Sequence, residues 1–164
     1  MEIKYFNSNF DKITQNKDTD QSITNVIEKL PSLNIVSDKN LLEETIKISN
    51  QFKEKKEKII VFGTGGSNLG ARALNNIISN NKIILEFYDN VDPINFEKNF
   101  QNINFELTGF LVISKSGTTP ETLSQFSCLY QKAIEANKVE DFFSNTLIIT
   151  EFKESPLFKI AKDN

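Results

Sequence analysis

Short apolar runs alternate with longer amphipathic stretches along most of the chain. Four runs are almost wholly apolar: residues 59–62, 83–88, 110–113 and 147–149. Runs of this length without polar alternation predict strands that are buried on both faces of a sheet. Four stretches that follow them place apolar residues at helical spacing: residues 68–79, 92–100, 120–137 and 155 onwards. Strands that alternate with helices predict an α/β fold, with a doubly wound parallel sheet flanked by helices.

The spacing of apolar residues also predicts which helix faces turn toward the sheet. In the helix expected over 68–79, the inward residues are Leu69, Ala73, Leu74, Ile77 and Ile78. In the helix expected over 120–137, they are Leu123, Phe126, Tyr130, Ala133 and Ile134. We expect both sets to be buried against the sheet.

The first 37 residues are polar and only weakly patterned. Residues 23–30 follow helical spacing, and Pro31 is expected to end that helix. Asp38 is suited to cap the helix that follows. We therefore expect a short helical N-terminal extension, residues 1–37, and an α/β domain, residues 38–164.

Two distinctive turns follow the first and third predicted strands, and each precedes a helix. Their sequences are GTGGS at residues 63–67 and SKSGTT at residues 114–119. In a parallel sheet both turns open at the edge formed by the carboxyl ends of the strands. Ligands of such sheets bind at that edge, near a topological switch point.

The second turn combines four hydroxyls, one ammonium group and a flexible glycine: Ser114, Lys115, Ser116, Gly117, Thr118 and Thr119. It leads into a helix N-terminus, whose free N–H groups and dipole favour an anion such as phosphate. The alternative is a helix cap, in which Thr119 pairs with Glu121 or Thr122. A cap needs one hydroxyl and this turn has four, which favours an anion site.

The glycine-rich first turn leaves its backbone accessible to a ligand, and three interpretations of it remain open. It can be a tight strand-to-helix turn, part of a phosphate site, or part of a dinucleotide site in which Asp89 binds a ribose. The dinucleotide pattern requires glycine at position 68, which is Asn68, and no Gly-Lys-Ser/Thr follows as in a P-loop. Two such turns at one edge favour a small phosphorylated ligand.

Composition and charge exclude several classes of function. The chain of 164 residues has no histidine, one cysteine and a formal net charge of −3. It therefore contains no Ser-His-Asp triad, histidine-ligated metal site or internal disulfide of its own. Its charge provides no general attraction to nucleic acid or to an anionic membrane. It lacks a long apolar segment and a secretory signal, so we expect a cytoplasmic protein.

The sequences of these two turns resemble motifs of a known family. The sequences GGSNLG at residues 65–70 and SKSGTTPET at residues 114–122 resemble the GGSxLG and SKSGTTxET motifs of glucose-6-phosphate isomerases. The resemblance covers roughly residues 38–164 and implies a flavodoxin-like sugar isomerase (SIS) domain. It further implies that the chain is the N-terminal part of such an enzyme, with the C-terminal part missing.

The resemblance assigns roles to individual residues. It implies that six residues surround the substrate phosphate: Ser114, Lys115, Ser116, Gly117, Thr118 and Thr119. Gly66 and Ser67 would contact the sugar phosphate from the facing turn, and Glu121 would orient a histidine that this chain lacks. The proton-shuttling glutamate and the arginine of the family also have no counterpart here. We expect no complete catalytic set and an inactive isolated chain.

The implied reaction is the interconversion of glucose 6-phosphate and fructose 6-phosphate, in glycolysis and gluconeogenesis. It requires no metal and no organic cofactor, and the resemblance implies a homodimer for the full-length enzyme. A stand-alone phosphosugar-binding regulatory module remains an alternative. For Arg72 we expect a surface role, and for Cys128, with no base nearby, an inert one.

Overall fold

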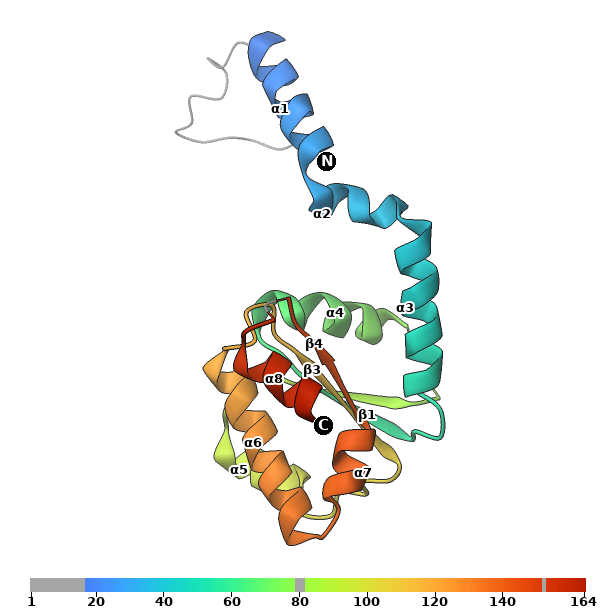
Figure 1. Cartoon of the computed structure of the whole chain (residues 1–164), viewed down its shortest axis with the longest axis vertical. Helices are drawn as coiled ribbons and strands as arrows, with labels where there is room; N and C mark the ends of the chain where they lie inside the picture. Colours follow the sequence, from blue (N-terminus) through green and yellow to red (C-terminus); the bar gives the residue numbers. More distant parts are fainter. Residues whose placement is uncertain (1–16, 79–81, 152) are drawn as a thin grey trace. The chain divides into compact units, whose positions relative to one another are not determined.

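The computed structural model describes residues 17–78, 82–151 and 153–164 (Figure 1). The chain divides into two compact units, Met1–Lys47 and Ile48–Asn164. No helix within the described ranges is both long and apolar enough to cross a membrane.

The first unit is helical in its described part. It contains α1 (Lys17–Lys29), α2 (Pro31–Asn34), a short 3-10 turn (Ile35–Ser37) and the beginning of α3 (Lys39–Phe52). The expected helix before Pro31 is present, and a new helical segment begins at that proline because its fixed φ suits a first turn. The Asp38 carboxylate accepts a hydrogen bond from the Leu41 N–H at 3.0 Å, which confirms the expected cap.

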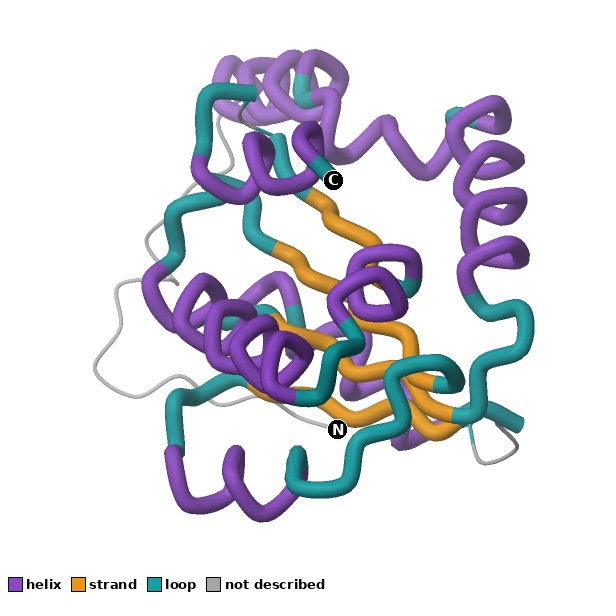
Figure 2. Tube along the Cα trace, turned by 60° about the horizontal axis from the view of Figure 1, so that its bottom comes forward, coloured by secondary structure: helices purple, strands orange, loops and turns teal. Residues whose placement is uncertain are grey.

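The second unit is built on a four-stranded parallel sheet, drawn in orange in Figure 2. Its strands are β1 (Lys58–Phe62), β2 (Ile84–Tyr88), β3 (Thr108–Ile113) and β4 (Thr146–Ile149). Their order is β2-β1-β3-β4, and every neighbouring pair is parallel. The prediction of a doubly wound parallel α/β sheet is confirmed.

Helices flank the sheet on both faces. They are α4 (Leu69–Ile77), α5 (Pro93–Asn99), α6 (Pro120–Glu135), α7 (Val139–Ser144) and α8 (Pro156–Asp163). Right-handed crossovers place α4 on one face and α5, α6 and α7 on the other, because the chain reverses its direction across the sheet after β2. Helix α8 follows the last strand and adds Leu157 to the core on the same face as α6 and α7. The switch point therefore lies between β1 and β3, which are neighbours in the sheet.

The hydrophobic core lies between the sheet and helices α5 to α8. It consists of Ile60, Phe62, Phe100, Phe105, Phe110, Val112, Phe126, Leu129, Ala133, Phe142 and Leu157. The ring centroids of Phe110 and Phe142 are 5.1 Å apart, so α7 packs its aromatic side chain directly on β3. Six of the eleven core residues are phenylalanines, and their large apolar area is the main source of stability on this face.

The expected burial of α4 is wrong. Its apolar residues Leu69, Leu74 and Ile77 are 59%, 60% and 77% exposed. On this face the sheet is covered in part by Phe52 of α3, whose ring packs beside Gly109 and Ile59. The periodicity predicted an apolar stripe correctly, but no described residue covers it.

The core face of α6 is also shifted from the expected one. Ile134 is 42% exposed, whereas Leu129 and the polar residues Thr122 and Gln125 are buried. The buried residues lie three, four, seven and eleven positions after Thr122, so Ile134 falls outside the stripe.

Candidate functional site

The two polar turns meet at the switch point of the sheet. Residues 63–67 follow β1 and residues 114–119 follow β3, the neighbouring strand. A Cβ atom on Gly63 would lie 3.1 Å from the Ser67 Cβ and 3.3 Å from the Ile113 carbonyl oxygen. The first turn is thus packed against the residue that directly precedes the second turn, and glycine at position 63 permits this close approach.

The second turn is organised by hydrogen bonds among its own polar groups. The Ser114 and Thr119 hydroxyl oxygens lie 2.8 Å apart, and the Gly117 N–H donates to the Ser114 hydroxyl oxygen at 3.1 Å. The Thr118 hydroxyl donates to that of Ser116 at 3.1 Å. Ser114 is buried, whereas Ser116 and Thr118 are exposed. The hydrogen bonds of the buried Ser114 hydroxyl fix the shape of the turn, and the exposed hydroxyls of Ser116 and Thr118 face solvent.

Gly117 holds the second turn on the connection between β4 and α8. Its φ is +65°, and a Cβ atom there would lie 2.8 Å from the Thr150 hydroxyl and closer still to the Ser155 side chain. The Leu157 N–H donates to the Gly117 carbonyl at 3.3 Å. Both the backbone conformation and the lack of space therefore require glycine. Figure 1 shows the connections after β3 and β4 side by side at this edge of the sheet.

The helices that follow the two turns begin without a side-chain cap. Helices α5 and α8 are capped, since Asp92 accepts from the Ile94 N–H at 3.0 Å and Ser155 from the Phe158 N–H at 3.2 Å. Neither Asn68 at the start of α4 nor Thr119 at the start of α6 makes a cap hydrogen bond. Both are good capping residues, but their side chains bond elsewhere.

The N-termini of α4 and α6, whose first N–H groups are not bonded by a cap side chain, therefore both lie at the switch point of the sheet. Each carries the equivalent of about half a positive charge from the helix dipole. Added to them are the hydroxyls of the second turn and the Lys115 ammonium, which is 79% exposed and lies 3.6 Å from Glu151. This combination is suited to bind an anion with several oxygens, above all a phosphate.

Comparison with known proteins agrees with this chemistry. The phosphoglucose isomerase family model matches residues 13–159. The chain belongs to the phosphoglucose isomerase family.

Two curated relatives illustrate the extent of the similarity. The glucose-6-phosphate isomerase of Prochlorococcus marinus is 35% identical over 120 residues, which are 71% of this chain and 22% of that protein. The corresponding enzyme of Borreliella burgdorferi is 34% identical over 126 residues, 73% of this chain and 23% of that protein. The chain thus spans less than a quarter of the length of these relatives.

Solved structures show the same similarity in three dimensions. A glucose-6-phosphate isomerase from Chlamydia trachomatis matches with a TM-score of 0.61 and 25% identity, over 70% of this chain and 23% of that one. A hypothetical protein from Thermus thermophilus matches with a TM-score of 0.65 and 27% identity, over 74% and 30% of the two chains.

Glu121, which the resemblance implies would orient a histidine, lies exposed at the N-terminal end of α6. In the turn after β1, Gly66 is exposed and Ser67 is half-buried. All of them lie at the carboxyl edge of β1 and β3, so the structure gathers every predicted site residue at one edge of the sheet.

The carboxylate of Asp89, which a dinucleotide site would need for the ribose, is already engaged. The Arg72 guanidinium donates to it at 3.1 Å, and the Arg72 side chain is 50% exposed. Arg72 therefore neutralises the acid at the end of β2. Together with Asn68 in place of glycine, this ion pair argues against a dinucleotide site in this isomerase-family chain.

Three buried polar residues were not recognised from the sequence. Asn68, Thr122 and Gln125 are at most 2% exposed, and each has one side-chain oxygen without a hydrogen-bond partner among the described residues. Thr122 and Gln125 precede Phe126 and Leu129 on the buried stripe of α6, and this spacing was a usable signal. Asn68 gave no such signal, because its burial depends on contacts with the turn.

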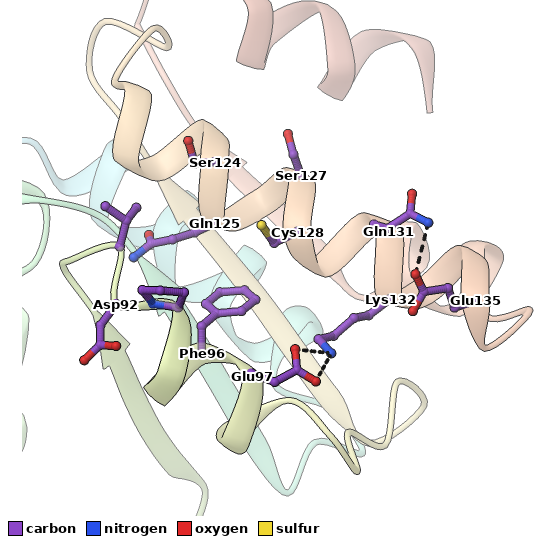
Figure 3. Close-up of a pocket in the computed structure, with 12 residues that line it drawn as sticks. Asp92, Phe96, Glu97, Ser124, Gln125, Ser127, Cys128, Gln131, Lys132 and Glu135 are labelled. Atoms are coloured by element: carbon purple, nitrogen blue, oxygen red, sulfur yellow. Dashed lines mark hydrogen bonds and ion pairs between the residues drawn. The ribbon is translucent and has the colours of Figure 1, made fainter.

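A groove of about 580 Å³ lies elsewhere, between α5 and α6 (Figure 3). Its walls include Phe96 and Cys128, and an ion pair closes one end, where the Lys132 ammonium lies 3.1 Å from Glu97. No residue of either turn lines it. Cys128 is exposed here. Among the described residues, no three acidic or cysteine side chains converge as metal ligands.

Proposed function

We propose that this chain forms the phosphate-binding part of a glucose-6-phosphate isomerase, which interconverts glucose 6-phosphate and fructose 6-phosphate. Membership of the family supports the reaction, and the two turns support the ligand. The observation that carries the proposal is the pair of uncapped helix N-termini beside the cluster of hydroxyls. Residues 38–164 act as the sugar-phosphate-binding domain, and residues 1–37 as an extension of it.

The second turn holds the phosphate and the first turn holds the sugar end of the ligand. The phosphate oxygens are bound by Ser114, Lys115, Ser116, Gly117, Thr118 and Thr119. Gly66 and Ser67 contact the sugar phosphate from the other side of the switch point. Support comes from the close packing of Gly63 on the end of β3, where an added Cβ atom would lie 3.3 Å from the Ile113 carbonyl oxygen. This packing brings the two turns within reach of one small ligand.

The chemistry needs ring opening, proton transfer by a carboxylate through a cis-enediol, and a cation to stabilise the developing oxyanion. The chain contains no histidine, so Glu121 orients one supplied from outside these residues. What these residues provide is binding energy remote from the reacting carbons, which positions the sugar. They bind the ligand but do not turn it over by themselves. The complete enzyme is a cytoplasmic homodimer that needs no cofactor.

Calorimetric titration of the chain tests the proposal. We expect glucose 6-phosphate to bind and NAD to show no heat of binding. Ser114→Ala removes the hydroxyl that orders the turn and is expected to weaken binding about tenfold or more, as for a hydrogen bond to a charged group. Ser127→Ala, on the exposed side of α6, serves as the matched control with unchanged affinity.

Two results would contradict the proposal. Binding of NAD without binding of glucose 6-phosphate would favour a dinucleotide site. Isomerase turnover by these residues alone, abolished by Ser114→Ala, would refute the division between binding residues in this chain and catalytic residues outside it.

A further inference from the structure

Asn68 connects three parts of the structure at the candidate site. Its side-chain Nδ2 donates to the Gly63 carbonyl at 3.0 Å, across the base of the first turn. Its backbone N–H donates to the Gly65 carbonyl at 3.1 Å, and its carbonyl accepts from the Arg72 N–H at 3.0 Å. One fully buried residue thus joins the end of β1, the turn and the first turn of α4.

The side chain of Asn68 is diverted from the role that its position favours. Asparagine at an N-cap normally uses its oxygen to accept a hydrogen bond from the second or third N–H of the helix. Asn68 makes no such bond, and its amide is directed back to Gly63. The N–H groups of Gly70 and Ala71 are therefore not occupied by the N-cap side chain, and they lie where α4 begins, beside the switch point.

This arrangement is unfavourable for folding. The Asn68 Oδ1 atom is buried and has no hydrogen-bond partner among the described residues. An unpaired buried acceptor destabilises the folded state, because it has lost its bonds to water. A residue selected for stability alone would pair this oxygen, for instance as a helix cap. The geometry thus favours a role in shaping the turn.

We propose that Asn68 is a positioning residue of the sugar-phosphate site. Through its bond to Gly63, it holds residues 63–67 in the conformation that presents Gly66 and Ser67, and it leaves the N-terminus of α4 open to the ligand. It touches no ligand atom itself. This inference rests on the proposed function, because it assumes that a sugar phosphate occupies the switch point.

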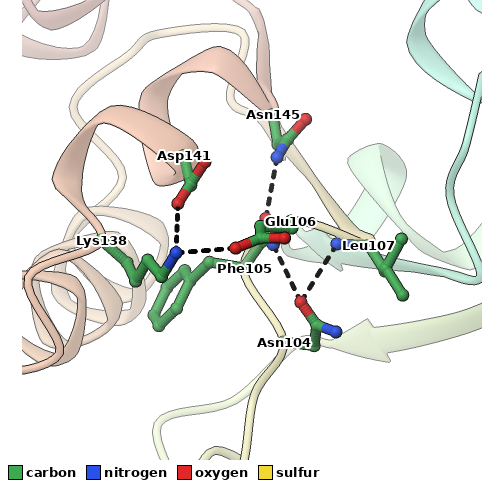
Figure 4. A network of polar contacts seen from close by, with 7 residues as sticks. All are labelled: Asn104, Phe105, Glu106, Leu107, Lys138, Asp141 and Asn145. Atoms are coloured by element: carbon green, nitrogen blue, oxygen red, sulfur yellow. Dashed lines mark hydrogen bonds and ion pairs between the residues drawn. The ribbon is translucent and has the colours of Figure 1, made fainter.

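A matched pair of substitutions tests the role. In Asn145, at the opposite edge of the sheet, the side-chain Nδ2 donates to the Phe105 carbonyl at 2.8 Å (Figure 4). Asn68→Ala and Asn145→Ala each remove one amide-to-carbonyl hydrogen bond. We expect Asn68→Ala to weaken glucose 6-phosphate binding by ~5-fold or more, and Asn145→Ala to change it by less than ~2-fold.

We expect the two variants to rank in the opposite order in their loss of stability. Asn68→Ala also removes the unpaired oxygen, which offsets part of the lost hydrogen bond. Asn145→Ala has no such compensation, so it lowers the urea midpoint more than Asn68→Ala does. A residue with a purely structural role would instead show the larger loss of stability and no specific loss of affinity.

Amide hydrogen exchange on the unmodified chain gives a second measurement, which does not depend on whether a variant folds. We expect the Gly70 and Ala71 amides to exchange more slowly once glucose 6-phosphate is bound. The side-chain-capped amides of Ile94 and Asn95 in α5 serve as internal controls and should not change.

The possible outcomes separate the two proposals. Intact binding by Asn68→Ala, or equal weakening by both variants, overturns the positioning role alone. So does unchanged exchange of the α4 amides in a chain that binds the ligand. Failure of the unmodified chain to bind glucose 6-phosphate overturns the proposed function and this inference with it.

Discussion

Replacement of Gly117 by alanine should damage the second turn and the fold around it. The residue has φ +65°, a conformation that L side chains rarely adopt. Its α-carbon also faces the connection between β4 and α8, where an added Cβ would lie 2.5 Å from the Ser155 Cβ and 2.8 Å from the Thr150 hydroxyl. Real Cβ contacts are longer than this, so the start of α8 must move.

The size of the effect follows from the backbone conformation and the lack of space for a Cβ atom. A left-handed conformation costs a residue with a Cβ about 1–2 kcal/mol. Overpacking of a filled site costs a further ~1–3 kcal/mol. The free energy of unfolding should therefore fall by about 2–5 kcal/mol, out of the ~5–15 kcal/mol typical of a domain. With a urea dependence of about 2 kcal/mol per molar, the midpoint falls by roughly 1–2.5 M.

Urea unfolding followed by circular dichroism measures this shift, and Gly70→Ala is the matched control. Gly70 lies in α4, and an added Cβ would find no atom within 4 Å. Alanine there should stabilise the helix by about 0.5–1 kcal/mol. A Gly117→Ala midpoint equal to that of the unmodified chain, or shifts of the same sign in both variants, would refute the reasoning.

Three further predictions concern charged and titrating groups. Burial, and to a lesser extent the charge of Glu86, raises the pKa of Tyr88 to about 12. The free energy of unfolding should therefore fall as the pH rises from about 10 to about 12, because the unfolded state loses this proton first. Ultraviolet titration should show one tyrosine that ionises at unusually high pH, and Tyr88→Phe should remove that transition. Glu151→Gln removes the ion pair of Lys115, in which the Lys115 side chain is 79% exposed and that of Glu151 61% exposed. Because exposed ion pairs are weak, the freed ammonium should tighten phosphate binding at most ~5-fold at low salt. Glu154→Gln should not have this effect. Hydrogen bonds to Glu106 and Asp141 raise the pKa of Lys138, so Lys138→Met should lower the urea midpoint without changing ligand affinity.

The strands and the two turns were predictable from the sequence because their signals are local. β1 and β3 lie at the centre of the sheet and are mostly buried, as their continuous apolar runs predict. The same prediction is wrong for β2 and β4, which are only half-buried because they are the edge strands. Helix α7 was not predicted, because its six residues are too few to show a helical period. Its core contact, Phe142, is apparent only from packing against β3.

Features that depend on contacts between distant segments were not predictable. The apolar stripe of α4 was recognised, but a period cannot show whether anything covers that stripe. Thr119 was a plausible helix cap, yet its hydroxyl lies 2.8 Å from that of Ser114, five residues earlier. In the sequence, Asn68 stands out mainly as a departure from a dinucleotide pattern. Its link to Gly63 depends on the folded conformation of the turn, which the residue types alone do not specify.

The proposed function depends on the two turns binding one ligand together. Chemical-shift mapping by ¹H–¹⁵N NMR during a titration with glucose 6-phosphate tests this directly. We predict that the amides of residues 65–71 and 114–119 shift together along one binding curve, while those lining the groove between α5 and α6 remain unchanged. Shifts confined to that groove, or to one turn only, would contradict the central claim.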